Sequence, residues 1–193
     1  MNLYGEKVML RAMEPEDMEM LREMINDPEV ERMVGGWSFP VSKHIQSQWY
    51  EKVANDRQNL RFVIEVQESG EAIGLITLTD INWKDGVGEE GIKLRPGAPK
   101  REGYATDALM TLEWYVFEEL RFHRLEARWL SHNEASKRLH AKCGMKHEGI
   151  RRSAIFKNNQ YLDQYCAGIL RNEYFEVKKR LGWQSYGERR NWQ

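Results

Sequence analysis

The chain has 193 residues, in which 29 lysines and arginines nearly balance 30 aspartates and glutamates and leave a formal net charge of −1. This length suits one domain with a hydrophobic core, and the near-zero charge excludes a global field that would steer the protein to nucleic acid or to a membrane. The only cysteines are Cys143 and Cys166, which argues against a disulfide framework and favours a reducing compartment.

Charge is distributed unevenly along the chain. Residues 1–31 contain nine acidic and three basic residues, whereas residues 137–152 are strongly basic. This pattern would suit an anionic cofactor at one place and a cationic substrate at another. No apolar run is long enough to span a membrane, and the N-terminal segment lacks the layout of a signal peptide. We therefore expect a cytoplasmic protein with no membrane partner.

The N-terminal segment is predicted to form one strand and three helices. Residues 7–11 read as a strand, and a helix follows whose apolar residues recur at helical spacing. That stripe consists of Met18, Leu21, Met24 and Ile25. Pro28 ends this helix and starts a second, short one, and Ser42 is placed to cap a third.

Two apolar strands, at residues 62–66 and 72–79, flank a turn and are predicted to pair as a hairpin. The following run Gly86–Gly91 matches the pattern G-x-G-x-x-G. A dinucleotide-binding fingerprint must open a helix, whereas this run leads into a strand that ends near Pro96. We therefore reject a Rossmann-type nucleotide site.

The stretch from Ile92 to Glu119 combines a strand, a loop and a long amphipathic helix, and the rest of the chain is organised around it. The first N–H groups of a helix lack partners within the helix, and the helix dipole favours negative charge there. Gly103 allows the backbone to approach a ligand closely, and Lys100 and Arg101 add positive charge. The loop is therefore suited to a pyrophosphate.

The C-terminal half is predicted to alternate strands and helices. A strand at residues 125–130 leads to a helix at 134–142, which Asn133 caps. A hairpin and a closing helix follow, and the aromatic tail at 182–193 is expected to pack on its own domain or on a second chain, as in a homodimer.

Three of these segments resemble the GNAT N-acetyltransferases. The loop Lys100–Ala105 is similar to the acetyl-CoA loop of that family, usually Gln/Arg-x-x-Gly-x-Gly/Ala, with lysine in the first place. Residues Glu89–Leu94 resemble the family's fourth strand. The second half of the family signature is matched by Asn133, Ser136, Lys142, Gly144 and Met145.

The resemblance implies an α/β (α+β) fold. The expected sheet is mixed and mostly antiparallel, has about seven strands, splays between the fourth and fifth strands, and is flanked by helices. A single acetyltransferase domain would span residues 1–181, with the tail at 182–193. The Leu-Arg opening and the run Asn26–Val30 resemble the RimJ/RimL-like branch, which acetylates the N-termini of ribosomal proteins.

The resemblance implies acetyl-CoA as the cofactor. The implied contacts are Ile92, Leu94, Lys100, Arg101, Glu102, Gly103, Tyr104, Ala105, Thr106, Asn133, Ser136 and Arg138. No metal is expected, because the histidines form no close ligand pair with each other or with cysteine.

The catalytic assignments leave alternatives open. A carboxylate must take the proton of the acceptor amine. Because side chains alternate faces along a strand, Glu89 and Glu90 point in opposite directions, and one of the two could face the acceptor and act as the base. The resemblance places Glu89 on the family glutamate and His140 where many members have a tyrosine that protonates the leaving thiolate. Ser136 is the other candidate for that acid. Trp37 and Phe39, together with Glu89 and Glu90, are expected to contact the acceptor.

The acceptor is the main open question. The RimJ/RimL-like resemblance favours a protein N-terminal amine, and the runner-up is a small amine, either a polyamine such as spermidine or an amino sugar. A noncatalytic CoA-binding domain would keep the loop and lack a working base. A nucleic-acid module using residues 137–152 is the least favoured alternative.

Overall fold

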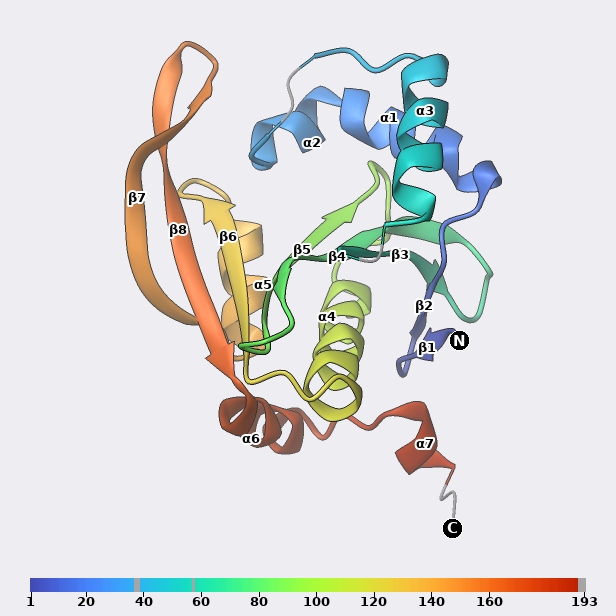
Figure 1. The fold of residues 1–193 in the computed structure, drawn as a ribbon, viewed down its shortest axis with the longest axis vertical. Coiled ribbons are helices and arrows are strands. Elements are labelled where there is room, and N and C mark those ends of the chain that lie inside the picture. Colours follow the sequence, from blue (N-terminus) through green and yellow to red (C-terminus); the bar gives the residue numbers. More distant parts are fainter. Residues whose placement is uncertain (37–38, 57, 191–193) are drawn as a thin grey trace.

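The computed structural model describes residues 1–36, 39–56 and 58–190, and an eight-stranded sheet lies at its centre (Figure 1). The strands are β1 (Leu3–Tyr4), β2 (Val8–Arg11), β3 (Leu60–Val66), β4 (Ala72–Asn82), β5 (Val87–Leu94), β6 (Arg124–Leu130), β7 (Lys146–Lys157) and β8 (Gln160–Leu170). Their order across the sheet is β1-β2-β3-β4-β5-β6-β8-β7. The expected mixed, mostly antiparallel sheet is confirmed, with the short β1 as the additional strand.

Helices flank the sheet and fall into two groups. They are α1 (Met18–Asn26), α2 (Pro28–Met33), α3 (Lys43–Ala54), α4 (Tyr104–Trp114), α5 (Glu134–Lys142), α6 (Arg171–Leu181) and α7 (Tyr186–Arg189). Figure 1 shows α1, α2 and α3 gathered at the top, well away from α4 and α6. A 3-10 turn (Pro15–Asp17) leads into α1, and a π-helical turn (Tyr115–Glu119) extends α4. Ser42 caps α3 as expected, since its hydroxyl accepts a hydrogen bond from the N–H of Ile45.

The sheet opens between β5 and β6, its only parallel pair of neighbouring strands in the described chain. The pairing runs from Val87 opposite Arg124 to Glu90 opposite Ala127. Beyond Glu90, β5 continues against β4 alone, and beyond Ala127, β6 continues against β8 alone. The edge of β5 from Gly91 to Leu94 therefore presents backbone groups to the gap, because no second strand pairs with them there.

The alternation of side chains along β5 separates two environments. Glu90 is buried on the face covered by α4 and α5, where it lies near His140 of α5. Lys93 lies on the other face and lines a cavity together with side chains of α1, α2 and α3. Because successive residues of a strand point to opposite faces, Glu89 shares the face of Lys93. The two adjacent glutamates therefore serve different sides of the sheet.

Asp107, in the first turn of α4, joins distant parts of the chain. Its buried carboxylate accepts hydrogen bonds from the backbone N–H groups of Glu6, Lys7 and Val8, at 2.7–2.9 Å. The same carboxylate accepts a hydrogen bond from the indole N–H of Trp183, at 2.6 Å. The turn before β2, the start of α4 and the C-terminal tail are thus held together by one side chain.

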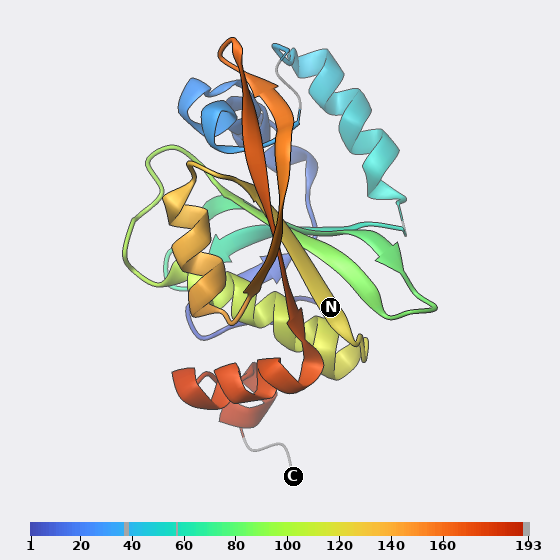
Figure 2. The ribbon, with the colours of Figure 1, turned by 90° about the vertical axis from the view of Figure 1, so that its left-hand side faces the viewer.

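The described part of the tail packs on the chain's own N-terminal strands. In Figure 2, α6 and the tail, in red, lie below α4. Trp183 is buried, the ring of Tyr186 contacts that of Tyr4, and Arg189 donates to the carbonyl oxygen of Gly5. Of the two placements expected for the tail, the structure therefore shows the intramolecular one for residues up to 190. Trp192 lies outside the described residues.

We predict that Asp107→Asn destabilises the protein by at least about 2 kcal/mol, because an amide cannot accept from all four donors and leaves buried N–H groups unpaired. Urea unfolding followed by circular dichroism measures the change. The control is Asp85→Asn in the exposed β4–β5 turn, where the carboxylate serves one side-chain partner. Equal stability of the two variants would contradict the assignment.

Candidate active site

The loop between β5 and α4 has the geometry of an anion cradle. Gly103 is the N-cap residue of α4 and has a φ of 87°, a left-handed conformation that favours glycine. The preceding Lys100, Arg101 and Glu102 are exposed, whereas Tyr104 is partly buried. The N–H groups of the first helical turn, including those of Ala105 and Thr106, have no carbonyl partner within the helix. They are available to an anion beside Gly103.

Lys7 adds a cation that the sequence did not reveal. Its ammonium group donates a hydrogen bond to the carbonyl oxygen of Glu102 at 2.6 Å and lies next to Gly103. Lys7 directly precedes β2 in the chain, and β2 packs on α4. Only the tertiary structure brings this lysine to the loop, so no local pattern could have shown it.

The open edge of β5 leads from the cradle to the point where the strands part. Ile92 and Leu94 are partly buried on the α4 side of the sheet, and their backbone lies along the gap. An extended ligand arm can pair with such an edge as an additional strand would. The cradle and the edge are thus continuous along one path.

The start of α5 borders the other side of the gap. The side-chain oxygen of Asn133 accepts from the N–H of Ser136 at 3.0 Å, and its amide nitrogen donates to the carbonyl of Met33 at 2.9 Å. Asn133 therefore caps α5, as expected, and also holds the end of α2. Arg138, on the following turn, is exposed.

His140, which follows Ser136 by one helical turn, is buried and not exposed on the helix surface. Its Nδ1 lies 2.7 Å from the carbonyl oxygen and 3.1 Å from the hydroxyl of Ser136. Its ring stacks on Trp129 at 4.9 Å between centroids, and its Nε2 lies 3.6 Å from a carboxylate oxygen of Glu90. Ser136, His140 and Glu90 thus form a continuous line of polar groups.

Glu113 of α4 belongs to the same buried cluster. Neither its carboxylate nor that of Glu90 has a hydrogen-bond partner among the described residues. Burial raises the pKa of Glu90 to about 8, and burial together with the Glu90 charge raises the pKa of Glu113. Burial also lowers the pKa of His140. Near neutral pH this cluster therefore holds protons on its carboxyl groups, as a proton donor must.

Glu113 is marked in the sequence by its position on a helix face. It follows Leu109 by four residues, so it falls on the apolar stripe of the helix, where a charged residue is out of place. A charge on such a stripe indicates a functional or strained position.

Glu89 lies on the opposite face in a different setting. Its Oε2 atom is bound by the guanidinium of Arg128, with one contact at 2.6 Å, and Arg128 also reaches Asp80 at 3.2 Å. The other Glu89 oxygen, Oε1, has no hydrogen bond within the described chain and remains available as an acceptor. Arg128 could not be assigned to the site from the sequence, because it comes close to Glu89 only when β6 pairs with β5.

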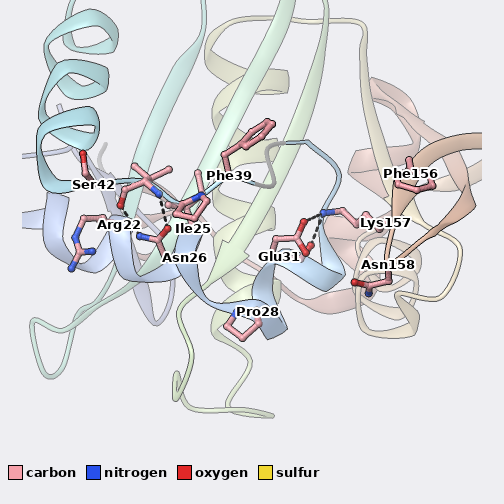
Figure 3. Close-up of a pocket in the computed structure, with 12 residues that line it drawn as sticks. Arg22, Ile25, Asn26, Pro28, Glu31, Phe39, Ser42, Phe156, Lys157 and Asn158 are labelled. Atoms are coloured by element: carbon pink, nitrogen blue, oxygen red, sulfur yellow. Dashed lines mark hydrogen bonds and ion pairs between the residues drawn. The ribbon is translucent and has the colours of Figure 1, made fainter.

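Two adjoining cavities lie on the Glu89 face. One, of about 460 Å³, is enclosed by α1, α2 and α3 over Leu75 and Lys93. The other, of about 820 Å³, is bordered by Phe39 and by Phe156 of β7 (Figure 3). Phe39, one of the two aromatic residues predicted to contact the acceptor, therefore lines the larger cavity. Trp37, the other one, lies outside the described residues.

The described residues fit a CoA-type cofactor. The cradle at Gly103 is flanked by the cations of Lys7, Lys100 and Arg101, which suits a diphosphate. The unpaired β5 edge offers backbone groups to an amide-containing arm. The arm would end where the strands part, between the Glu89 face and the Glu90 cluster.

Comparisons with known proteins agree with this geometry. The sequence model of the acetyltransferase (GNAT) domain matches residues 7–146. The chain belongs to the GNAT acetyltransferase family. It is 31% identical to the SPbeta prophage-derived uncharacterized N-acetyltransferase YokL of Bacillus subtilis (strain 168), over 88% of this chain and 93% of the relative. It is 26% identical to the putative ribosomal N-acetyltransferase YdaF of the same organism, over 88% and 94%.

A solved structure of spermidine N-acetyltransferase from Vibrio cholerae, in complex with CoA and spermine, has a similar fold. The TM-score is 0.79 at 25% sequence identity, covering 88% of this chain and 98% of the other. This GNAT protein is thus an acyltransferase that uses acetyl-CoA. No helix in the described ranges is long and apolar enough to cross a membrane. The same ranges contain no cluster of three metal-ligating side chains.

We predict that Gly103→Val weakens CoA binding by at least about tenfold, because a β-branched residue is strained at positive φ and its side chain would enter the cradle. Isothermal titration calorimetry with CoA measures the loss. Gly70→Val is the matched control, since Gly70 has a φ of 70° in the β3–β4 turn with open space around it. Normal CoA affinity of the Gly103 variant would refute the cradle.

The Glu90 pKa predicts a pH dependence of stability. A carboxyl whose pKa rises from 4.5 to about 8 on folding keeps its proton in the folded protein after the unfolded chain has lost it. Its contribution therefore falls as pH rises from about 4.5 to about 8, by on the order of a few kcal/mol. We expect Glu90→Gln to remove part of this loss in urea unfolding at pH 5, 7 and 9.

The control for this measurement is Glu119→Gln, on an exposed carboxyl at the end of the π-helical turn. It should lose stability with pH just as the unmodified protein does. Parallel pH profiles for Glu90→Gln and the unmodified protein would show that Glu90 ionises normally.

Proposed function

We propose that this enzyme transfers the acetyl group of acetyl-CoA to the primary amine of a small molecule. The observation that carries the proposal is the 460 Å³ cavity beneath α1, α2 and α3, which lies on the Glu89 face beside the open edge of β5. A cavity of this size holds a small molecule. The spermidine N-acetyltransferase of similar fold supports a small amine as the acceptor class.

Glu89 is the proposed base. An amine is mostly protonated at neutral pH, and only its neutral form can attack the thioester carbonyl. Glu89 lies on the same face of the sheet as the cavity, its Oε1 atom has no hydrogen bond in the described chain, and Arg128 fixes the carboxylate through Oε2. Glu89 can therefore take the proton directly or through a water molecule. The backbone N–H groups of the open β5 edge are placed to stabilise the developing oxyanion.

The Glu90 cluster is the proposed source of the proton for the leaving thiolate. Bound acetyl-CoA supplies the activated acyl group, and its departing sulfur must be neutralised. Glu90 holds a proton near neutral pH, His140 lies 3.6 Å away, and Ser136 borders the gap. A proton moving along this line would reach the gap from the face opposite to Glu89, which keeps acid and base apart.

A protein N-terminal amine is the second candidate acceptor. The similarity to the putative ribosomal N-acetyltransferase YdaF supports it, as does the resemblance to the RimJ/RimL-like branch. The 820 Å³ cavity adjoins the inner one, with which it shares Ile25, Glu31 and Val41, and it offers additional volume for a peptide end. A noncatalytic CoA-binding role is disfavoured, because both an acid and a base candidate border the gap.

A thiol-release assay with acetyl-CoA tests the proposal. The acceptor panel should include amino acids, monoamines, spermidine, aminoglycosides and ribosomal-protein N-terminal peptides. Turnover of small amines above that of the peptides is expected. Turnover of peptides alone would favour the second candidate, and CoA binding without turnover of any amine would indicate a noncatalytic domain.

We expect Glu89→Gln to lower kcat by about 10²- to 10⁴-fold, the usual contribution of a general base. The loss should be greatest at low pH, where almost all of the amine is protonated, and CoA affinity should be unchanged. Asp80→Asn is the control, since Asp80 contacts the same arginine and lies farther from the gap. If Glu90→Gln instead shows this pH-dependent loss, the base is Glu90.

A further inference from the structure

We propose that the acceptor is an amine with an apolar body and a single carboxylate, such as an α-amino acid with an apolar side chain, and that Lys93 binds its carboxylate. This inference rests on the proposed function and concerns the 460 Å³ cavity. The proposed acceptor differs from a polycation such as spermine, because it carries a carboxylate and a single amine.

Lys93 is placed to bind a group of the acceptor. It follows Gly91 on the same face of β5, about 7 Å farther along the strand. With its cross-strand partner Leu75 it lines the cavity, and its side chain remains open to solvent there. The flexible stem of a lysine covers part of the distance back toward Glu89. An amine beside Gly91, where the strands part, and a carboxylate at Lys93 thus fit one small molecule, with Glu89 taking the amine proton through a water molecule.

The charge of Lys93 is not compensated within the described chain. The cavity has one other charged lining residue, Glu31 of α2. Lys157 of β7 is ion-paired with Glu31 and also donates to its backbone carbonyl at 2.9 Å (Figure 3). Lys93 has no hydrogen-bond or ion-pair partner among the described residues. Because Glu31 is already paired with Lys157, the positive charge of Lys93 is left uncompensated in the cavity.

The electrostatic setting of Lys93 favours an incoming anion. The helices over the cavity enclose Lys93 only in part, and this partial loss of water, followed by the charge of Lys157, lowers the pKa of its ammonium group. A partly desolvated cation gains more from a carboxylate partner than one in bulk water. Because Glu31 lines the same cavity, a singly charged carboxylate is a better fit than a doubly charged phosphate.

The remainder of the lining is apolar. It includes Met24 and Ile25 of α1, Val30 of α2, and Ile45 and Trp49 of α3. Such a surface binds hydrocarbon groups and offers few partners to a chain of ammonium groups. A spermine molecule in this cavity would also meet the positive charge of Lys93.

The acidic residues of the N-terminal segment do not change this picture. Most of those that line a hollow, including Glu16, Glu19 and Glu23, border a separate one beside Arg95 and Pro96. Among these acidic residues, Glu31 therefore lines the acceptor cavity, whereas Glu16, Glu19 and Glu23 lie elsewhere.

The test compares three forms of one scaffold: phenylalanine, phenylalaninamide and phenethylamine, with the leucine series and spermine alongside. The kcat/KM values are expressed per unprotonated amine, since the amine pKa differs among them. We expect the carboxylate forms to exceed their amides and decarboxylated amines by at least about tenfold, as one charge-assisted contact allows. Spermine should be the poorest acceptor.

Variants of Lys93 test whether this residue causes the preference for a carboxylate. Lys93→Met should lower kcat/KM for phenylalanine by at least about tenfold and bring the ratio of phenylalanine to phenethylamine close to one, with CoA affinity retained, whereas Lys93→Arg should keep the preference. Lys84→Met, on an exposed lysine in the β4–β5 turn, is the matched control and should behave like the unmodified enzyme.

The contrary outcomes are distinct. A preference for spermine or for decarboxylated amines, or an equal effect of Lys93→Met on all acceptors, would overturn the inference and leave the acetyltransferase assignment intact. No turnover of any amine, with CoA still bound in calorimetry, would instead overturn the proposed function.

Discussion

The separation of β5 from β6 after Glu90 is the constraint on which the rest of the structure depends. Paired strands satisfy each other's backbone groups, so a sheet that opens must offer those groups to something else. Here the open edge of β5 leads directly from the loop at Gly103, and α5 borders the opposite side. The fold thereby leaves backbone hydrogen-bonding groups of β5 unpaired along the path proposed for the cofactor.

The alternation of β5 side chains divides the chemistry between the two faces of the sheet. Glu89 shares its face with the proposed acceptor cavity and is held by Arg128, whereas Glu90 is buried beside His140. Environment alone therefore gives two adjacent glutamates different properties: one remains close to solvent, and the other retains a proton near neutral pH. This separation suits a reaction that needs a base and an acid in the same gap.

The same arrangement carries a cost in stability. Two carboxyl groups without hydrogen-bond partners in the described chain, Glu90 and Glu113, are buried next to each other, which opposes folding when either ionises. Contacts elsewhere offset this, most clearly at Asp107, whose carboxylate ties the N-terminal turn and Trp183 to α4. Strain at a site and compensation outside it are the expected pattern for an enzyme.

The sequence by itself determined most of the elements and their succession along the chain, the loop at Gly103 and the opposite orientation of Glu89 and Glu90. These features depend on local periodicity, capping and turn residues, which act over a few neighbours in the chain. Only the tertiary structure decided which face each glutamate serves, that Lys7 and Arg128 join the site, that His140 is buried, and that Lys93 lacks a partner in the described chain. Those properties arise from contacts between residues far apart in sequence, and burial and charge compensation cannot be evaluated until the strands and helices are packed.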